Sequence, residues 1–540
     1  MRILFHARIL LCIAACAFLL VACSEKGGQP LSDGGTSAKS TVSEREITVK
    51  TTTQKSQSED PEVTTTVTEQ DIHLHEWSQW EAVLIPTCTE SGLNERKCPC
   101  GASERASVDA AGHVDGDWIL DSEASKDTEG LEHLVCRNCS QTVRTEIIER
   151  GSQGLDYAVS NGIATVTGIG ECTDSEIVIP SHYRGCPVTD IGREAFQLLK
   201  NITEVVIPEG VTSIGYLAFR GCTSLEHVYL PNSLKTVMGS SFQGCTSLEV
   251  IVLPEGVTRI DQSAFSACSA LKEFTVPKGV KSIEECLFFE CTSLVNVVFH
   301  NGVESIGESV FEGCTALTEF TLPEGLSSMG SSVFSGCVSL KSIEIPKGVK
   351  ILPSYAFSGC TSLERVILCD GLQFVDGYAF NLCSSLKEIT LPDKVQRLGP
   401  YAFNKCSSLT SVVIPASVHD FVDGVFSECT SLTTLTLPKS MGDIDEKMFY
   451  KCSSLTSIVI PENVRRIEEE AFYGCSSLTT VYLPSTFQRF DGEALAECPM
   501  LTSIYYDGTL EEWKALYRAV GWIDEGSHLT VICTDGTVEI

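Results

Sequence analysis

Seven cysteine and histidine residues in the N-terminal part of the chain have the types and spacing of metal ligands. They lie in residues 71–150, where a 38-residue pattern of His, Trp, Gly and a close cysteine pair occurs twice. The candidates are His75, Cys88, Cys98, Cys100, His113, Cys136 and Cys139. Two thiolates on a tight turn, together with a further Cys or His, form the ligand set that tetrahedral Zn²⁺ prefers. Units this small also bury little core and need additional stabilisation.

The two copies resemble the short His/Trp/Cys repeats found beside surface domains of secreted bacterial proteins, which are zinc-ribbon-like. Two features depart from a zinc ribbon. Cys98 and Cys100 are separated by one residue, where ribbons have two or more. Lys126 replaces Cys88 in the second copy, which lacks one ligand unless His133 or the first copy supplies it. Disulfides among the module's cysteines are the alternative to zinc, and any zinc would be structural because no His-Glu-x-x-His pattern is present.

A second repeat, of 23 residues, would carry any extended binding surface. Phenylalanine recurs at this interval from Phe196 to Phe472, and Leu495 takes the next place. Cysteine recurs at the same interval from Cys222 to Cys498, with no insertion or deletion. A constant period of roughly 20–29 residues, with Leu-x-x-Val/Ile-x-Leu in each unit, is typical of a leucine-rich-repeat solenoid. Such a stack presents a surface, which favours binding over catalysis.

Residues 225–245 show how one coil is expected to fold. Val228 and Leu230 point inward and alternate with outward neighbours, which is the period-2 pattern of a half-buried strand. Pro231 ends that strand because it has no backbone N–H to donate. Phe242 then fills the core before the chain turns into the next coil. A single unit cannot bury these side chains, so folding depends on stacking.

The repeated pattern Ala-Phe-x-Gly-Cys-x-Ser-Leu-x-x-Val/Ile-x-Leu/Ile-Pro resembles the BspA-like leucine-rich repeats of bacterial surface proteins. The resemblance covers about residues 190–506. It implies a mainly β solenoid of about fourteen coils over residues 191–506, with a β-hairpin cap within 151–190 and a helix and strand cap within 507–540. At about 4.8 Å per coil, the stack would be roughly 65–70 Å long.

The two caps have sequence signals of their own. Residues 157–180 contain two β-rich segments, 164–167 and 177–180, which resemble the family's N-terminal hairpin. Thr509 to Glu512 has the form of a capping box, which predicts a helix running through Trp513, Leu516 and Val520. A final strand is expected at 529–533. Such caps cover the open ends of a sheet that would otherwise pair with another chain.

The N-terminus predicts export and lipid attachment. Arg2 and Arg8 precede an apolar stretch, and residues 20–23, Leu-Val-Ala-Cys, resemble the bacterial lipobox, whose cysteine is lipidated. Residues 1–23 are therefore predicted to be a lipoprotein signal peptide, with Cys23 as the lipidated residue. The apolar stretch is too short for a membrane span of about 20 residues. Residues 24–70, rich in Ser and Thr, predict a disordered linker.

The net charge limits the class of partner, and the positions of the cysteines indicate their redox state. The net charge of −32 argues against nucleic acid as a partner. Thirteen of the 26 cysteines occupy one equivalent position per repeat, and an odd number cannot pair off completely. Side chains stacked in register also run parallel, which is poor disulfide geometry. We therefore predict a ladder of reduced cysteines in the solenoid core.

One strand position in each coil is expected to point outward and to form a continuous row, called the outward row below. Contiguous exposed apolar and aromatic residues mark partner sites, although Val, Thr and Ile also fit a strand by propensity alone. Tyr229, Tyr482 and Tyr505 are therefore the candidate partner-binding residues. The outward row consists of Val206, Tyr229, Val252, Thr275, Val298, Thr321, Glu344, Ile367, Thr390, Val413, Thr436, Val459, Tyr482 and Tyr505.

Taken together, the sequence predicts a surface protein that is not an enzyme. No nucleophile elbow, phosphate loop or paired-carboxylate motif stands out, so no catalytic residue is assigned. The solenoid needs no cofactor, and zinc is expected only in 71–150. The expected partners are host or bacterial surface macromolecules, protein or glycan, with membrane contact only through the lipid anchor. The alternatives are a subunit of an enzyme acting on surface polymers, and a metal-responsive lipoprotein using the Cys/His module.

Overall fold

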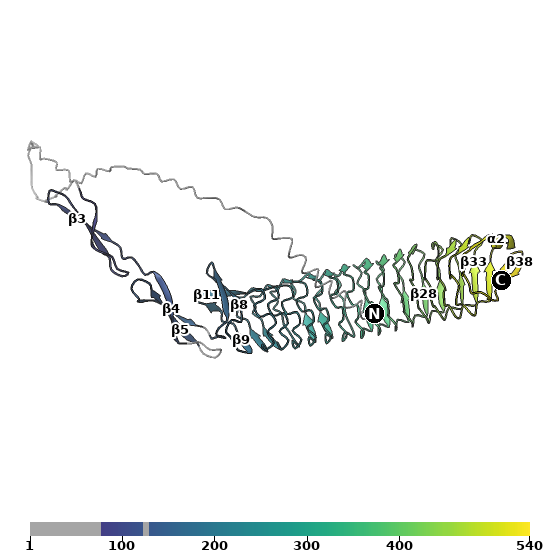
Figure 1. The fold of residues 1–540 in the computed structure, drawn as a ribbon, viewed down its shortest axis with the longest axis horizontal. Coiled ribbons are helices and arrows are strands. Elements are labelled where there is room, and N and C mark those ends of the chain that lie inside the picture. The colour runs from purple at the N-terminus through teal and green to yellow at the C-terminus, as the bar shows by residue number, and fades with distance from the viewer. Residues whose placement is uncertain (1–76, 123–128, 149) are drawn as a thin grey trace, which may run out of the picture. The chain divides into compact units, whose positions relative to one another are not determined.

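The computed structural model describes residues 77–122, 129–148 and 150–540 of the chain (Figure 1). The predictions for the signal peptide, Cys23, the linker 24–70 and His75 lie outside the described residues. Within the described ranges, no helix is long and apolar enough to cross a membrane.

The two 38-residue copies fold alike, each as a three-stranded antiparallel sheet whose strands pair in chain order. The first copy contains β1 (Glu81–Leu84), β2 (Gly92–Lys97) and β3 (Ser103–Val108). The second contains β4 (Asp115–Ser122), β5 (Gly130–Cys136) and β6 (Thr142–Ile148). The buried hydrophobic side chains described in this module are Cys98, Leu134 and Cys136. So small a core stabilises little by itself, which is why the sequence suggested a metal or disulfides.

The solenoid coils contribute two series of parallel strands. In the first series most paired strands are 23 residues apart, for example Glu204 with His227. The spacing is longer at the two ends, where Glu176 pairs with Glu204 and Ser503 with Thr530. Single bridges at Val250 and Glu319 continue the series where no full strand forms. Its strands are β9 (Glu176–Val178), β12 (Glu204–Val206), β14 (His227–Tyr229), β17 (Glu273–Thr275), β19 (Asn296–Val298), β22 (Ser342–Glu344), β24 (Arg365–Ile367), β26 (Glu388–Thr390), β28 (Ser411–Val413), β30 (Thr434–Thr436), β31 (Ser457–Val459), β33 (Thr480–Leu483), β35 (Ser503–Tyr506) and β37 (Thr530–Cys533).

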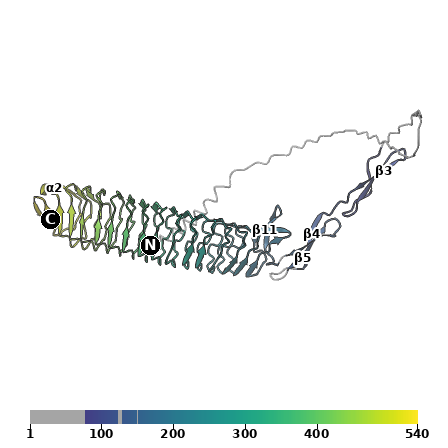
Figure 2. The ribbon, with the colours of Figure 1, turned by 180° about the vertical axis from the view of Figure 1, so that it is seen from behind.

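The second series follows a turn that contains Pro in most coils, and most of its strands have two residues. Both views of the ribbon show the coils stacked one after another in the same register (Figures 1 and 2). The strands are β11 (Cys186–Ile191), β13 (Ser213–Ile214), β15 (Thr236–Val237), β16 (Arg259–Ile260), β18 (Ser282–Ile283), β20 (Ser305–Ile306), β21 (Ser328–Met329), β23 (Ile351–Leu352), β25 (Phe374–Val375), β27 (Arg397–Leu398), β29 (Asp420–Phe421), β32 (Arg466–Ile467), β34 (Arg489–Phe490) and β36 (Tyr517–Arg518).

The repeated phenylalanines form a stacked column in the core. The ring centroids of Phe334 and Phe357 are 5.5 Å apart, and those of Phe357 and Phe380 are 5.6 Å apart. The turn holding each ring is tight: Tyr355 and Gly359, two residues before and after Phe357, both have left-handed backbone angles (φ 60° and 77°). Glycine adopts that conformation at least cost, which explains the Gly before many of the ladder cysteines. The predicted mainly β leucine-rich-repeat solenoid is confirmed.

The N-terminal hairpin forms, but with different strands from those expected. β7 (Asp156–Ser160) pairs antiparallel with β8 (Ile163–Gly168), which then pairs in parallel with β11. Residues 177–180 were expected to be part of this hairpin. Instead Ile177 pairs in parallel with Val205, so β9 begins the first strand series. A two-residue strand, β10 (His182–Tyr183), pairs with β11 at the same end.

The C-terminal cap contains α2 (Leu510–Ala515), which begins at the predicted capping box of Thr509 and Glu512. The prediction that the helix extends through Val520 is wrong. Leu516 is already extended, and the next two residues form β36, which pairs with β34, so strand pairing ends the helix after six residues. The expected final strand is β37, and β38 (Gly536–Glu539) pairs with it antiparallel and covers its edge.

Candidate binding surface and cysteine–histidine cluster

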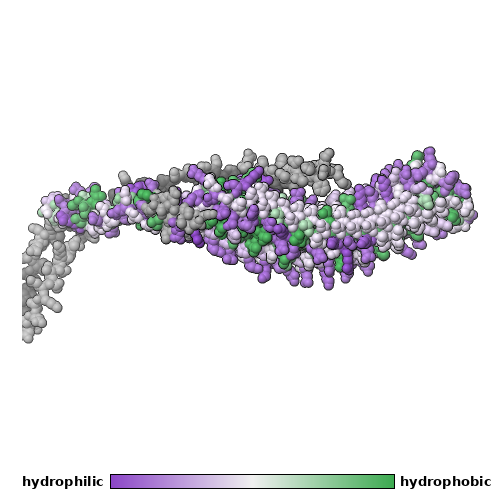
Figure 3. Space-filling view, turned by 90° about the horizontal axis from the view of Figure 1, so that it is seen from below, coloured by the Kyte–Doolittle hydropathy of each residue, from purple (hydrophilic) through white to green (hydrophobic). Residues whose placement is uncertain are grey.

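The outward row lies on the exposed side of the first strand series. In these three-residue strands the middle side chain is mostly buried and its neighbours mostly face solvent, as in β14, where Val228 is buried between two exposed residues. Every member of the row from Tyr229 to Tyr505 is exposed. Val252 and Val413 keep 75% and 70% of their surface exposed. On the face drawn in Figure 3, hydrophobic residues form small separate groups among hydrophilic ones, so broad apolar contact is not available there.

Tyr482 and Tyr505 form the aromatic end of the outward row. Their strands pair in register, and their rings stack with centroids 4.9 Å apart while both side chains stay about 40% exposed. A hollow of 440 Å³ lies beside them, lined in part by Val459, Glu462 and Asp507. This combination of ordered aromatic surface, a concave neighbour and acidic groups suits recognition of a protein segment.

The structure does not bring Tyr229 to this aromatic end. Tyr229 is 54% exposed on β14. It lies eleven repeats of 23 residues before Tyr482, since 482 − 229 = 253. At about 4.8 Å per coil, the separation is roughly 50 Å. A partner that contacts all three predicted tyrosines must therefore be an extended one.

Within the 23-residue repeats, two further groups of stacked tyrosines were not predicted from the sequence. Tyr355, Tyr378 and Tyr401 stack with centroids 4.9 and 5.2 Å apart, and Tyr450 stacks on Tyr473 at 5.2 Å. All five are half-buried, and they lie in the turns around the core phenylalanines and outside the strands. The signal that could have revealed them is the repeat itself, because each is 23 residues from the next in its stack.

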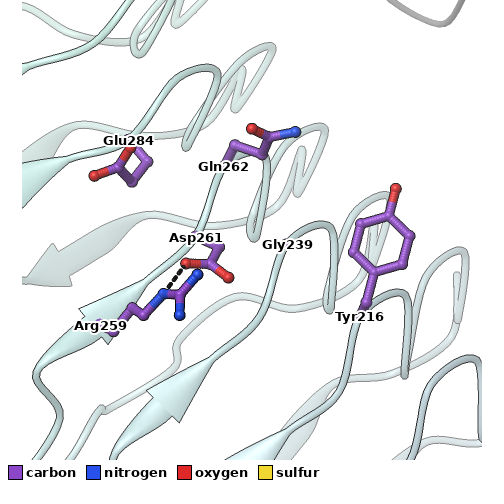
Figure 4. A pocket seen from close by; sticks show the side chains of 6 residues that line it. All are labelled: Tyr216, Gly239, Arg259, Asp261, Gln262 and Glu284. Atoms are coloured by element: carbon purple, nitrogen blue, oxygen red, sulfur yellow. Dashed lines mark hydrogen bonds and ion pairs between the residues drawn. The ribbon is translucent and has the colours of Figure 1, made fainter. Parts of the chain in front are cut away.

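A second hollow, of 520 Å³, lies between consecutive coils near the N-terminal end of the solenoid. Figure 4 shows the residues that line it, which come from consecutive coils and, except for Gly239, have polar side chains. Arg259 Nε lies 2.6 Å from Asp261 Oδ1, and Glu284 lines the same hollow. The arginine charge is thus already neutralised, which makes the hollow a poor anion site. The hollow offers no pairing of nucleophile and base for catalysis.

Four of the seven predicted metal ligands converge in the N-terminal module. Cys88 comes from the loop between β1 and β2 of the first copy, and His113 from the segment between β3 and β4, where the second copy begins. Cys136 and Cys139 flank the turn between β5 and β6. The donor atoms of all four residues lie within 4.8 Å of one another. Cys98 and Cys100, in the corresponding turn of the first copy, are not part of this cluster, and His75 lies outside the described residues.

The distances within the cluster are short. Cys88 Sγ lies 3.6 Å from Cys136 Sγ, and Cys139 Sγ lies 3.5 Å from His113 Nδ1. Cys136 is 1% exposed and Cys88 is half-buried, whereas His113 and Cys139 are exposed. The cluster is therefore closed on one side and open to solvent on the other.

Cys136 has the surroundings of a thiolate. The backbone N–H groups of Val114 and Asn138 each donate a hydrogen bond to its Sγ, at 3.4 Å. Burial raises the pKa of this thiol, but these hydrogen bonds and the one from His113 outweigh it and bring the pKa to about 5. The pKa of Cys88 moves in the opposite direction, because burial and the neighbouring Cys136 disfavour a second negative charge.

Similarity to known proteins agrees with the solenoid geometry. Residues 189–303, 281–410 and 398–516 match the family model described as BspA type leucine-rich repeat region. A leucine-rich repeat protein from Bacteroides ovatus ATCC 8483 is 28% identical over 70% of this chain and 98% of its own, with a TM-score of 0.56. A leucine-rich cell surface protein from Faecalibacterium prausnitzii A2-165 is 27% identical over 68% of this chain and 98% of its own, with a TM-score of 0.45.

No match is found among curated proteins. The matches to the family model together span residues 189–516, which is more than half of the 540 residues. Both the sequence period and the observed coils lie in this span. The chain therefore belongs to the BspA-type leucine-rich repeat family.

Proposed function

We propose that this chain is a lipid-anchored bacterial surface protein that binds other macromolecules through the outward row of its solenoid and serves adhesion. The observation that carries the proposal is the stack of Tyr482 and Tyr505 at the end of that row. Two aromatic rings held in register are exposed beside a hollow instead of being packed into the core. Tyrosine is among the residues that contribute most to protein interfaces.

The stacking also lowers the cost of binding. Each Tyr ring is held by its partner and by a strand ladder, so little side-chain entropy remains to be lost when a partner docks. The acidic residues Glu462 and Asp507 beside the rings favour a partner that brings Lys or Arg next to an apolar or aromatic group. We therefore expect a protein partner on the host or bacterial surface for this end of the row.

Attachment to the membrane belongs to the same proposal. Acyl chains on Cys23 would hold the chain at the outer side of a bacterial membrane, and residues 24–70 would act as the tether. A flexible linker of that length reaches roughly 35–40 Å. The solenoid surface could then meet a partner beyond the membrane without a spanning helix.

The proposal is tested by measuring whether the purified full chain binds immobilised extracellular-matrix proteins and whole bacterial cells. Saturable binding that excess soluble chain competes away, without turnover of matrix or cell-wall polymers, is the expected result. The proposal would be contradicted if the purified chain bound none of these surfaces, or if it hydrolysed a surface polymer.

A further inference from the structure

We propose that Cys88, His113, Cys136 and Cys139 bind one Zn²⁺ ion that joins the two N-terminal copies. The four residues supply three thiolates and one imidazole, a common ligand set of structural zinc sites. Cys88 comes from the first copy, and the other three ligands come from the second, in which His113 precedes β4. The site thus has four donors although neither copy has a complete set.

The distances in the cluster fit a tetrahedral ion. Two sulfurs bound to zinc at about 2.3 Å lie about 3.8 Å apart, and a bound sulfur and imidazole nitrogen lie about 3.6 Å apart. The corresponding distances here are 3.6 Å for Cys88 and Cys136 and 3.5 Å for Cys139 and His113. A disulfide would require about 2.0 Å between sulfurs. These two pairs therefore stand at the separation of ligands around a shared ion, and all four donor atoms lie within 4.8 Å of one another.

The turn that carries the second cysteine pair is built to present sulfur. Ser140 has a left-handed backbone (φ 57°), and its N–H donates to the carbonyl oxygen of Cys136 at 2.8 Å, which closes a tight turn. Cys136 and Cys139 consequently face the same side. The N–H groups of Val114 and Asn138 point at Cys136 Sγ, and such hydrogen bonds to a ligand orient it and stabilise its charge.

The loop that carries Cys88 is held against the segment connecting the two copies by backbone hydrogen bonds. Within the loop, the N–H of Thr87 donates to the carbonyl oxygen of Glu90 at 3.0 Å. The N–H of Ala111, in the connecting segment, donates to the carbonyl oxygen of Thr87 at 2.9 Å. Cys88 is therefore placed beside His113 by backbone contacts that do not need a metal. These contacts pre-organise the site and lower the cost of binding an ion.

The first copy provides a matched control within the same chain. Cys100 occupies the turn between β2 and β3, as Cys139 occupies the turn between β5 and β6, yet Cys100 is not in the cluster. Cys100→Ser removes one thiol from an equivalent turn and should not affect the metal. Cys139→Ser removes a ligand.

The test measures zinc in the full chain, purified under reducing conditions and supplied with Zn²⁺, by elemental analysis. We expect one ion per chain in the wild type and in Cys100→Ser, and loss of that ion in Cys88→Ser and in Cys139→Ser. Replacement by Co²⁺ should give the visible absorption of a tetrahedral thiolate site in the same two proteins that keep zinc. Because the solenoid forms its own core, circular dichroism shows whether the solenoid of each variant has folded.

Three results would overturn the proposal. The first is a wild-type chain that takes up no zinc or cobalt after reduction. The second is mass spectrometry showing a Cys88–Cys136 disulfide that prevents uptake in the exported protein. The third is equal metal loss in Cys100→Ser and Cys139→Ser, which would place the ion elsewhere. None of these results depends on whether the outward row binds a partner.

Discussion

The thiol of Cys245 donates a hydrogen bond to the carbonyl oxygen of Phe219, in the preceding coil, at 3.2 Å. The same contact recurs in every coil from Cys222 to Cys498, at 3.0 to 3.2 Å. Each sulfur therefore faces a backbone oxygen of the neighbouring coil and not the next sulfur. Burial raises the pKa of these thiols, that of Cys268 to about 12.

These ladder cysteines should be reduced and unreactive in the folded protein, because the thiolate is the reactive form and burial suppresses it. Alkylation of native protein should modify exposed Cys100 and leave the ladder unmodified, whereas alkylation after unfolding should modify both. Peptide mass spectrometry gives the answer site by site. A bridge between successive ladder positions, such as Cys245 and Cys268, would show that the prediction is wrong.

Replacing Phe357 by Ala should destabilise the solenoid by about 3–5 kcal/mol, because it leaves a cavity in the middle of the stacked phenylalanine column. Thr390→Ala, on the exposed outward row, should change the free energy of unfolding by no more than about 0.5 kcal/mol. Equilibrium unfolding in guanidinium, followed by circular dichroism, compares the two variants. A loss below about 1 kcal/mol for Phe357→Ala would mean that the column can repack.

Asp445 should make the solenoid more stable as the pH falls. Burial first, and then the nearby Glu468, Asp423 and Asp443, raise its pKa from 3.8 to about 7. The folded chain therefore binds the Asp445 proton more tightly than the unfolded chain does. The resulting contribution to folding stability is complete below the unfolded pKa and is lost as the pH rises through the folded pKa of about 7.

Asp445→Asn should consequently raise the melting temperature at pH 8 and reduce the gain in stability on acidification to pH 5. Asp393→Asn, which removes one exposed carboxylate, is the control for net charge. Calorimetry at several pH values measures both. Equal pH profiles for wild type and Asp445→Asn would contradict the assignment.

The solenoid could be predicted from the sequence because equivalent positions in the stacked coils need the same residue type, so the fold appears as a sequence repeat. The phenylalanine and cysteine columns, and the exposure of Tyr482 and Tyr505, follow directly from the 23-residue period. The strand boundaries at the ends could not be predicted as well. At Leu516 strand pairing competes with helix propagation, and the sequence alone does not decide which is stronger.

The Cys/His cluster was predictable as a set of residues but not as an arrangement. The sequence suggested seven candidate ligands, with Cys88 and His113 in different copies. Their approach depends on the loop after β1 folding onto the connecting segment, through the backbone contact of Ala111 with Thr87. Backbone contacts of this kind leave no residue pattern. The tyrosine stack at Tyr355 escaped prediction for a different reason, because it lies in turns, where no alternation of inward and outward residues marks a side chain as exposed.

Cys23→Ala should release the protein from the membrane, because the lipobox cysteine is the only proposed site of acyl attachment. Labelled fatty acid should enter the wild-type chain and not the variant, and fractionation should move the variant from the membrane to the soluble fraction. A variant that stays with the membrane, together with a wild type that takes up no label, would contradict lipid anchoring.

The proposed binding surface is tested most directly by replacing Tyr482 and Tyr505 with Ser in one chain and comparing it with the Tyr450→Ser, Tyr473→Ser double variant. Both doubles remove a stacked tyrosine pair, but only the first pair belongs to the outward row. The affinity for a matrix protein or cell surface that the wild type binds is measured for both, with the melting temperature as a check of folding. The account predicts at least about a tenfold loss, roughly 1.4 kcal/mol, for the outward pair and wild-type affinity for the control. Wild-type affinity in both, with binding abolished by deleting residues 77–150, would assign recognition to the cysteine module and contradict the account.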